Sequence, residues 1–297
     1  MYLKDFTYHK PQTLIEACRI LEQCNNGSPI AGGTDILVEL KKGLRQNEEI
    51  VSLMEIKELK TINENGSELI IGSCATHNEV LKSSLVKKII PALSEAASKI
   101  GTDQIRNTGT IGGNLCTGAS CCDMAPILIA LNASVEIVSS TSKRVVSLKD
   151  FFIFHKETSI KKGELMTKII VPIPQSNVGT SFEKFGLRET ASISVASVCV
   201  SITSDGNICT DSSIVIGAVA PTPRMSKKGS EILNGKKINE LAKDSALLKS
   251  IGETVVKDSL PVDDLRGSAE FRRQLVNVLT QRAVVKAAKR SINYLIE

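Results

Sequence analysis

Two glycine-rich stretches decide the fold of this chain: PIAGGTDI at residues 29–36 and TGTIGGNL at residues 108–115. Glycine lets the backbone turn sharply and leaves space for a ligand to approach the backbone amides. Successive amides in such a turn converge on phosphate, and Thr34, Thr110 and Asn114 add side-chain hydrogen-bonding groups. Taken alone, the first stretch is more typical of a structural turn. Together, the two stretches predict a long ligand held at two places, such as a dinucleotide.

The common nucleotide-binding motifs are missing from the sequence. No G-x-G-x-x-G occurs, and at residues 229–236 five residues separate the glycines, with Lys237 where a phosphate loop has Ser or Thr. A Rossmann domain and a P-loop NTPase are therefore disfavoured. Asp123 follows the second glycine stretch and lies close to Pro126, at the start of a predicted helix. Its carboxylate either binds a ribose hydroxyl or caps that helix, and the sequence alone leaves both open.

The composition is that of a globular protein with a sizeable core. The chain has 297 residues, which suggests about two domains. Its 42% hydrophobic and 23% charged residues exclude a disordered chain, a collagen-like fibre and a small disulfide scaffold. Aromatic residues make up 3%, too few for platforms that stack the bases of single-stranded nucleic acid. The net charge of +5 is spread along the chain, so an anionic small ligand and no charged partner are both consistent with it.

The sequence predicts a cytoplasmic protein without membrane insertion. It has no run of ~18 apolar residues, and Lys4 and Asp5 stand where a signal peptide has its apolar segment. No two cysteines have C-x-x-C spacing, so we expect reduced thiols in the core and no metal or iron–sulfur site. The cysteines are Cys18, Cys24, Cys74, Cys116, Cys121, Cys122, Cys199 and Cys209.

The hydrophobic pattern and the turn residues predict an α+β chain with a boundary near Ser176. In the larger domain, residues 1–176, we expect helices after Thr13, after a capping box at 76–79, from Pro91 and over 126–131. Strands are predicted at 50–53, 69–72, 135–138 and 165–170, and a glycine-rich loop at 101–118. In the smaller domain, residues 177–297, strands at 194–203 and 213–217 flank a two-residue Asp-Gly hairpin turn. Helices over 239–258 and 268–295 follow.

Five segments in order carry a resemblance to a known family. They are AGGTD at 31–35 with RNTGTIGGNL at 106–115, DMAP at 123–126, IGAVAPTPR at 216–224, and SAEFRR at 268–273. The chain resembles the FAD-binding subunit of molybdenum hydroxylases, of the xanthine, carbon monoxide and nicotinate dehydrogenase type. The resemblance covers nearly the whole chain. It implies an FAD-binding domain of the vanillyl-alcohol-oxidase/p-cresol-methylhydroxylase type, followed by a small α+β flavoprotein C-terminal domain.

The resemblance also implies which residues bind the FAD. The two glycine stretches surround its diphosphate, and Asp123 binds the ribityl or ribose part. Ile100 and Met166 lie at the isoalloxazine ring, and Lys184 places a cation near the cofactor. From the residues alone, Ile100 and Met166 fit a plain core and Lys184 a solvated lysine. The full set is Pro29, Ile30, Ala31, Gly32, Gly33, Thr34, Asp35, Ile36, Ile100, Thr110, Ile111, Gly112, Gly113, Asn114, Asp123, Met166 and Lys184.

The family's activity implies partners for this chain. A large molybdopterin-binding subunit oxidises the substrate, a small subunit carries two [2Fe–2S] clusters, and FAD passes the electrons to NAD or another acceptor. The FAD is expected to be non-covalent, because the 29–36 stretch contains neither His nor Cys. We expect no catalytic acid, base or nucleophile on this chain. Two other functions stay open: a stand-alone flavin oxidase, and a scaffold that has lost FAD.

Overall fold

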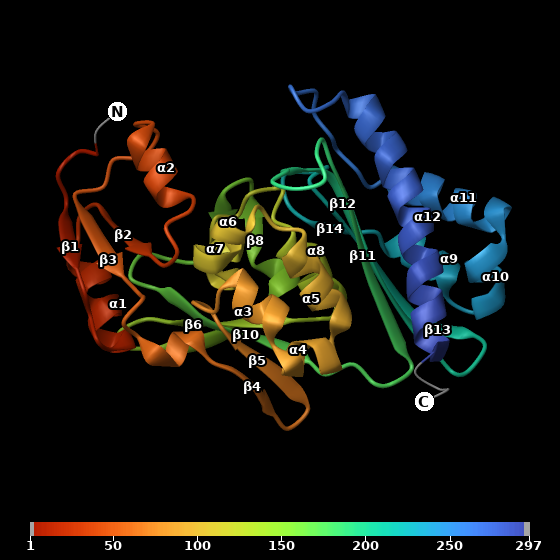
Figure 1. The fold of residues 1–297 in the computed structure, drawn as a ribbon, viewed down its shortest axis with the longest axis horizontal. Helices are drawn as coiled ribbons and strands as arrows, with labels where there is room; N and C mark the ends of the chain where they lie inside the picture. The colour runs from red at the N-terminus through yellow and green to blue at the C-terminus, as the bar shows by residue number, and fades with distance from the viewer. Residues whose placement is uncertain (1–2, 294–297) are drawn as a thin grey trace.

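The computed structural model describes residues 3–293, so the predicted end of the last helix at residue 295 lies outside the described residues. The N-terminal part is a small parallel sheet of order β1-β3-β2 (Figure 1). Its strands are β1 (Thr7–His9), β2 (Gly27–Ile30) and β3 (Glu49–Ser52), and the helices α1 (Leu14–Gln23) and α2 (Ile36–Lys41) connect them. The 29–36 glycine stretch therefore leaves the end of β2 and enters α2.

A five-stranded sheet of order β4-β5-β10-β6-β7 forms the middle of the molecule, with all neighbours antiparallel. Helices cover one of its faces (Figure 1). The strands are β4 (Ile62–Asn65), β5 (Glu68–Gly72), β6 (Ser134–Val138), β7 (Lys143–Ser147) and β10 (Leu165–Pro172). The helices are α3 (His77–Lys82), α4 (Ser84–Ile89), α5 (Pro91–Ser98), α6 (Asp103–Thr108), α7 (Ile111–Cys116) and α8 (Met124–Ala130). Short elements are η1 (Lys57–Lys60), η2 (Leu148–Asp150), β8 (Phe152–Phe154) and β9 (Glu157–Thr158).

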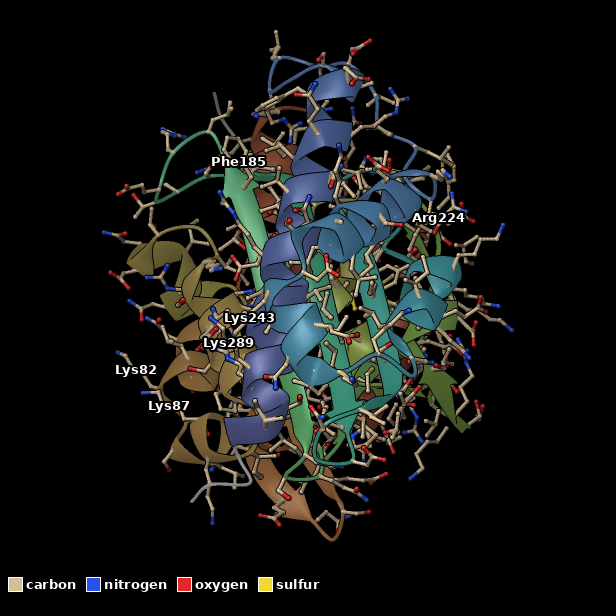
Figure 2. The ribbon with its side chains drawn as sticks, turned by 90° about the vertical axis from the view of Figure 1, so that its right-hand side faces the viewer. Lys82, Lys87, Phe185, Arg224, Lys243 and Lys289 are labelled. Atoms are coloured by element: carbon tan, nitrogen blue, oxygen red, sulfur yellow. The ribbon has the colours of Figure 1, made fainter. Side chains whose placement is uncertain are left out.

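The C-terminal part is an antiparallel sheet of order β11-β12-β13-β14, covered by helices. The long helix α12 lies across this sheet (Figure 2). The strands are β11 (Val178–Gly186), β12 (Ser194–Ser204), β13 (Cys209–Gly217) and β14 (Arg224–Met225). The helices are α9 (Lys227–Leu233), α10 (Ile238–Lys243), α11 (Ser245–Val256) and α12 (Ala269–Asn293).

Three sequence-based expectations differ from the structure. The expected loop at 101–118 contains two short helices, α6 and α7, because the Thr102 and Thr110 hydroxyls cap their first turns. The single helix expected at 239–258 is divided into α10 and α11 by Asp244, whose side chain caps α11. The turn between β12 and β13 spans residues 205–208 and is followed by a register shift, so it is longer than the two residues expected. Strand β11 was not predicted.

The hydrophobic core continues across the middle and C-terminal parts. Every residue of α8 is buried, and the same cluster of buried side chains includes Phe182 of β11, Cys199 of β12 and Val215 of β13. This continuous packing holds the start of α8 against the C-terminal sheet. The position of Asp123, directly before α8, is fixed by this packing.

Candidate cofactor site

A cavity of ≈ 560 Å³ opens between the N-terminal sheet, the helices of the middle layer and a loop of the C-terminal domain. Its volume is in the range that holds cofactor-sized ligands. Both glycine stretches line it, together with the start of β10 and residues 191–193 from the loop between β11 and β12. Four segments of the chain that are distant in sequence therefore meet at one concave site.

The two glycine stretches touch each other at the cavity. A side chain at Gly32 would place its Cβ 1.8 Å from the carbonyl oxygen of Thr108. No side chain fits at that distance, so glycine at this position is what allows the two backbones to meet. The amide of His77 also donates to the carbonyl of Gly109 at 3.0 Å, which attaches α3 to the same place.

The two stretches differ in what their backbone amides offer a ligand. Within residues 3–293, the amides of Gly32, Gly33 and Thr34 donate no hydrogen bond. In the second stretch, the amide of Gly112 donates to Ser73 and that of Gly113 to the Thr110 hydroxyl. The first stretch therefore has free donors for a phosphate. The second stretch is pre-organised by its own hydrogen bonds.

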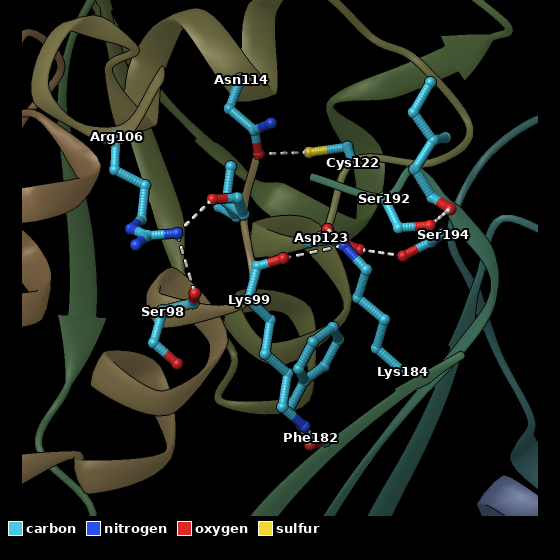
Figure 3. Close-up of polar contacts among 12 residues, drawn as sticks. Ser98, Lys99, Arg106, Asn114, Cys122, Asp123, Phe182, Lys184, Ser192 and Ser194 are labelled. Carbon is cyan, nitrogen blue, oxygen red and sulfur yellow. Dashed lines mark hydrogen bonds and ion pairs between the residues drawn. The ribbon is translucent and has the colours of Figure 1, made fainter. Parts of the chain in front are cut away.

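Asn114 supplies the clearest side-chain donor of the second stretch. Its Oδ1 accepts a hydrogen bond from the Cys122 thiol at 3.0 Å (Figure 3). This contact fixes the side-chain amide and leaves Nδ2 as a donor at the cavity wall. The adjacent cysteines Cys121 and Cys122 thus have different surroundings: Cys122 is buried against Asn114, whereas Cys121 lines the cavity.

Nearly all of the predicted site residues lie on this one cavity. The two exceptions are Ile111, which is fully buried, and Lys184, which is behind the wall. Neither exception is in contact with the cavity space itself. The lining residues among those predicted are Pro29, Ile30, Ala31, Gly32, Gly33, Thr34, Asp35, Ile36, Ile100, Thr110, Gly112, Gly113, Asn114, Asp123 and Met166.

Lys184 acts on the cavity through Asp123. Its ammonium lies 2.6 Å from Asp123 Oδ2 and donates to the carbonyl of Lys99 at 2.9 Å (Figure 3). The Ser194 hydroxyl donates to the other carboxylate oxygen. Burial raises the pKa of Asp123, and the Lys184 charge opposes that shift. Two side chains of the C-terminal part therefore hold a carboxylate of the middle part, and Lys184 neutralises its charge.

Neither aspartate of the predicted site caps a helix through its side chain. Asp123 stands at the N-terminal end of α8 without a capping hydrogen bond, because its oxygens are used by Lys184 and Ser194. Asp35 stands at the N-terminal end of α2, also without a capping bond, and accepts from the Thr117 hydroxyl at 3.4 Å. Of the two interpretations that the sequence left open for Asp123, helix capping is therefore wrong.

His77 is a cavity residue that the sequence did not indicate. It is 2% exposed, lines the cavity, and its Nδ1 has no hydrogen-bond partner among the described residues. Burial, with a contribution from the Arg106 guanidinium, lowers the pKa of His77 to about 4, so the ring is neutral at pH 7. Its only sequence signal is the place directly after Thr76 of the capping box. The pairing of Thr76 with Thr110, which brings it to the second stretch, is not visible in the sequence.

Comparison with known proteins agrees with a cofactor site at this cavity. Residues 4–174 match the family described as FAD binding domain in molybdopterin dehydrogenase, and residues 181–287 match the CO dehydrogenase flavoprotein C-terminal domain. The chain is 31% identical to the carbon monoxide dehydrogenase medium chain of Afipia carboxidovorans, over 97% of this chain and 98% of that one. It is 30% identical to the xanthine dehydrogenase FAD-binding subunit of Escherichia coli O157:H7, over 95% of each.

The similarity extends to three dimensions. The reconstituted CO dehydrogenase from Oligotropha carboxidovorans matches with a TM-score of 0.93 and 30% identity, over 98% of this chain and 100% of that one. The fold and the cavity define an FAD-binding protein of two domains. The chain belongs to the family of FAD-binding medium subunits of molybdenum hydroxylases, the flavoprotein subunits of these oxidoreductases. The predicted family and fold class are thus confirmed.

Proposed function

We propose that this chain passes electrons from the [2Fe–2S] clusters of a small partner subunit, through non-covalent FAD, to NAD or another acceptor. The electrons come from a substrate oxidised at a molybdenum cofactor on a large partner subunit. The observation that carries the proposal is the single cavity that both glycine stretches line. The eight cysteines are free, which supports a reducing compartment and the cytoplasmic location expected from the sequence.

The cavity fits FAD in both its space and its donors. We assign the diphosphate to the free amides of the first stretch and to Asn114 Nδ2. Asp123 faces the ribityl or ribose hydroxyls, and Ile100 and Met166 form the apolar wall at the ring. When bound, FAD supplies the redox chemistry, while the protein binds and orients it and tunes its surroundings.

The state of the cysteine thiols at the cavity supports non-covalent binding. Although the first glycine stretch has no Cys, the structure places Cys74, Cys116 and Cys121 on the cavity wall. Burial raises the pKa of the Cys74 thiol to about 11 and that of Cys116 to about 12, and it also raises that of Cys121. Thiolate is the nucleophilic form of cysteine, so these residues are poor candidates for attachment to a flavin.

Acid precipitation of the FAD-loaded chain tests directly whether the flavin is covalently attached. We expect all the flavin to appear in the supernatant, measured by its absorbance and by mass spectrometry of the precipitated chain. A chain that keeps the mass of a flavin after precipitation contradicts non-covalent binding.

The electron-transfer role is tested by comparing the isolated chain with the complex. We expect the purified chain to be yellow and to show no turnover of N-heterocycles or aldehydes. In the co-expressed complex, anaerobic addition of the hydroxylated substrate bleaches the flavin absorbance. Turnover by the isolated chain indicates a stand-alone oxidase, and a colourless chain that takes up no added FAD indicates a scaffold.

A further inference from the structure

Three potential metal ligands meet on the N-terminal sheet, and none of them lines the FAD cavity. They are His9 at the end of β1, Glu49 at the start of β3, and Cys24, which follows the last turn of α1. One ligand atom of each lies within 4.8 Å of the other two. The function proposed above does not use any of these residues.

The secondary structure holds the three side chains together. Strands β1 and β3 are parallel neighbours, and Glu49 is in register with Thr7, two residues before His9. Residues two apart on a strand point to the same face, so His9 and Glu49 share one face. His9 Nε2 lies 2.8 Å from Glu49 Oε2.

The backbone at Gly27 makes room for the third ligand. A Cβ at Gly27 would lie 2.6 Å from the Cβ of Cys24 and 3.0 Å from its Sγ. Glycine at this position therefore lets the Cys24 side chain lie beside the start of β2, where it is 4% exposed. The His9 and Glu49 side chains are 27% and 31% exposed, which gives an ion a path from solvent.

The chemistry of the three ligands favours zinc. Thiolate, imidazole and carboxylate all bind Zn²⁺, at about 2.3, 2.0–2.1 and 2.0–2.2 Å respectively. Ca²⁺ and Mg²⁺ prefer oxygen ligands only. Tetrahedral coordination at these bond lengths separates the ligand atoms by roughly 3.3–3.7 Å. The His9–Glu49 pair reaches that separation when its atoms move apart by less than about 1 Å, and Cys24 Sγ, which lies within 4.8 Å of both, has to approach them by about 1.5 Å at most.

We propose that His9, Cys24 and Glu49 bind one Zn²⁺, with water from solvent in the fourth position. Binding replaces the Cys24 thiol proton, which leaves to the buffer, by a zinc–sulfur bond. The ion links β1, the end of α1 and β3. It thereby stabilises the sheet from which β2 leads into the first glycine stretch.

Equilibrium dialysis of the full FAD-loaded chain against Zn²⁺, followed by elemental analysis, tests the site. The wild type should bind one Zn²⁺ per chain. The Cys24→Ser and His9→Gln variants should bind it at least ~10-fold more weakly, because each loses a direct ligand. His155→Gln, which removes an exposed histidine outside the cluster, is the matched control and should bind as the wild type does. Zinc should raise the melting temperature of the wild type and of the control only.

Cobalt substitution adds a readout that a structural role of Cys24 would not change. A thiolate-to-cobalt charge-transfer band, seen in a difference spectrum against the flavin, should appear in the wild type and be lost in Cys24→Ser. Flavin content reports folding of each variant, and Glu49→Gln, with a partly exposed side chain, replaces any variant that fails to fold. Equal zinc affinity in the wild type and in all three ligand variants, or no saturable binding, overturns the proposal and leaves a hydrogen-bonded cluster.

Discussion

Adjacent glycines of the second stretch have different tasks. A Cβ at Gly112 would lie 2.5 Å from the Cβ of Ser73 and 2.6 Å from its carbonyl oxygen, so this glycine allows α7 to pack on the chain after β5. A Cβ at Gly113 would meet a single atom within 4 Å, the Thr110 hydroxyl at 2.8 Å. Gly113 lines the cavity and is open on that side. We therefore expect the first glycine to serve the fold and the second to serve the ligand.

Substitution of each glycine separates the two tasks. Gly113→Val should weaken FAD binding by at least ~10-fold while the chain still folds, because its side chain occupies ligand space and displaces the Thr110 cap, which is worth about 1 kcal/mol. Gly112→Ala should lower the free energy of unfolding by about 1–3 kcal/mol, because the backbone has to move. Fluorescence titration with FAD and thermal unfolding measure the two effects. A Gly113→Val chain that purifies with full flavin content contradicts the assignment of the diphosphate.

His77 makes stability depend on pH. Its pKa of about 4 lies below the value near 6.5 of an unfolded histidine, so the unfolded state binds more protons between these values. The contribution of the neutral His77 ring to the free energy of unfolding is complete above pH 6.5 and is lost as pH falls toward 4. From pH 7 to pH 5 the loss is on the order of 2 kcal/mol. The comparison of wild type with His77→Gln by denaturant unfolding at both pH values isolates it. Equal losses in the two proteins contradict a buried neutral ring.

At the residue scale, the sequence indicated residues that gather at one cavity where their chemistry is local. Glycine, threonine and asparagine within eight positions indicated the cavity, because the turns and hydrogen bonds that these residues form depend on the backbone beside them. The partners of Asp123 lie 61 and 71 positions away, at Lys184 and Ser194. Only the packing of β11 and β12 against α8 brings them together, so the sequence left the aspartate between two interpretations, of which capping is wrong.

At the scale of elements, β11 contributes Lys184, whose positive charge pairs with Asp123 directly before α8. Lys184 and Asp123 side chains are each 7% exposed, and a buried ion pair that loses one partner leaves an uncompensated charge. Lys184→Met should therefore lower the free energy of unfolding by about 3–5 kcal/mol and reduce FAD retention. Thermal unfolding and the ratio of flavin to protein absorbance measure both.

Two further variants control this prediction. The double variant Asp123→Asn, Lys184→Met should recover most of the stability, since it removes both buried charges. Lys143→Met removes a lysine that is 65% exposed from a contact with Glu136, and it should cost at most about 1 kcal/mol. If Lys184→Met is as stable as Lys143→Met, the pair is not the link between the two elements.

Elements were predicted well where their ends carry a local signal. The capping box at Thr76 and the proline at the start of α5 are both present as expected. The helix α7 was missed because two of its six residues are glycine, which is unfavourable in isolated helices. In the folded chain, packing compensates for that cost. The amides of Ile111 and Gly112, for example, donate to the carbonyls of Ala75 and Ser73, and these partners are distant in sequence.

At the scale of the whole molecule, the two predicted domains are closely joined. Glu95 of α5 pairs with Arg290 and Lys286 of α12, and Lys99 donates to the carbonyl of Phe182 at 3.0 Å. These contacts add to the continuous core around α8. The boundary predicted near Ser176 divides the helices and strands into two consecutive groups along the chain. It does not imply that each part folds alone.

A fragment that ends at Ser176 tests whether the FAD-binding domain needs its neighbour. The truncation removes Lys184, the Phe182 side chain and the cavity wall at residues 191–193, and it leaves Asp123 without its cation. We expect the fragment to bind FAD at least ~100-fold more weakly than the full chain, because Asp123 loses its cation and the cavity loses one wall. Flavin content, FAD titration and thermal unfolding measure this. A fragment that purifies yellow and unfolds cooperatively shows that the C-terminal domain is not needed for the site.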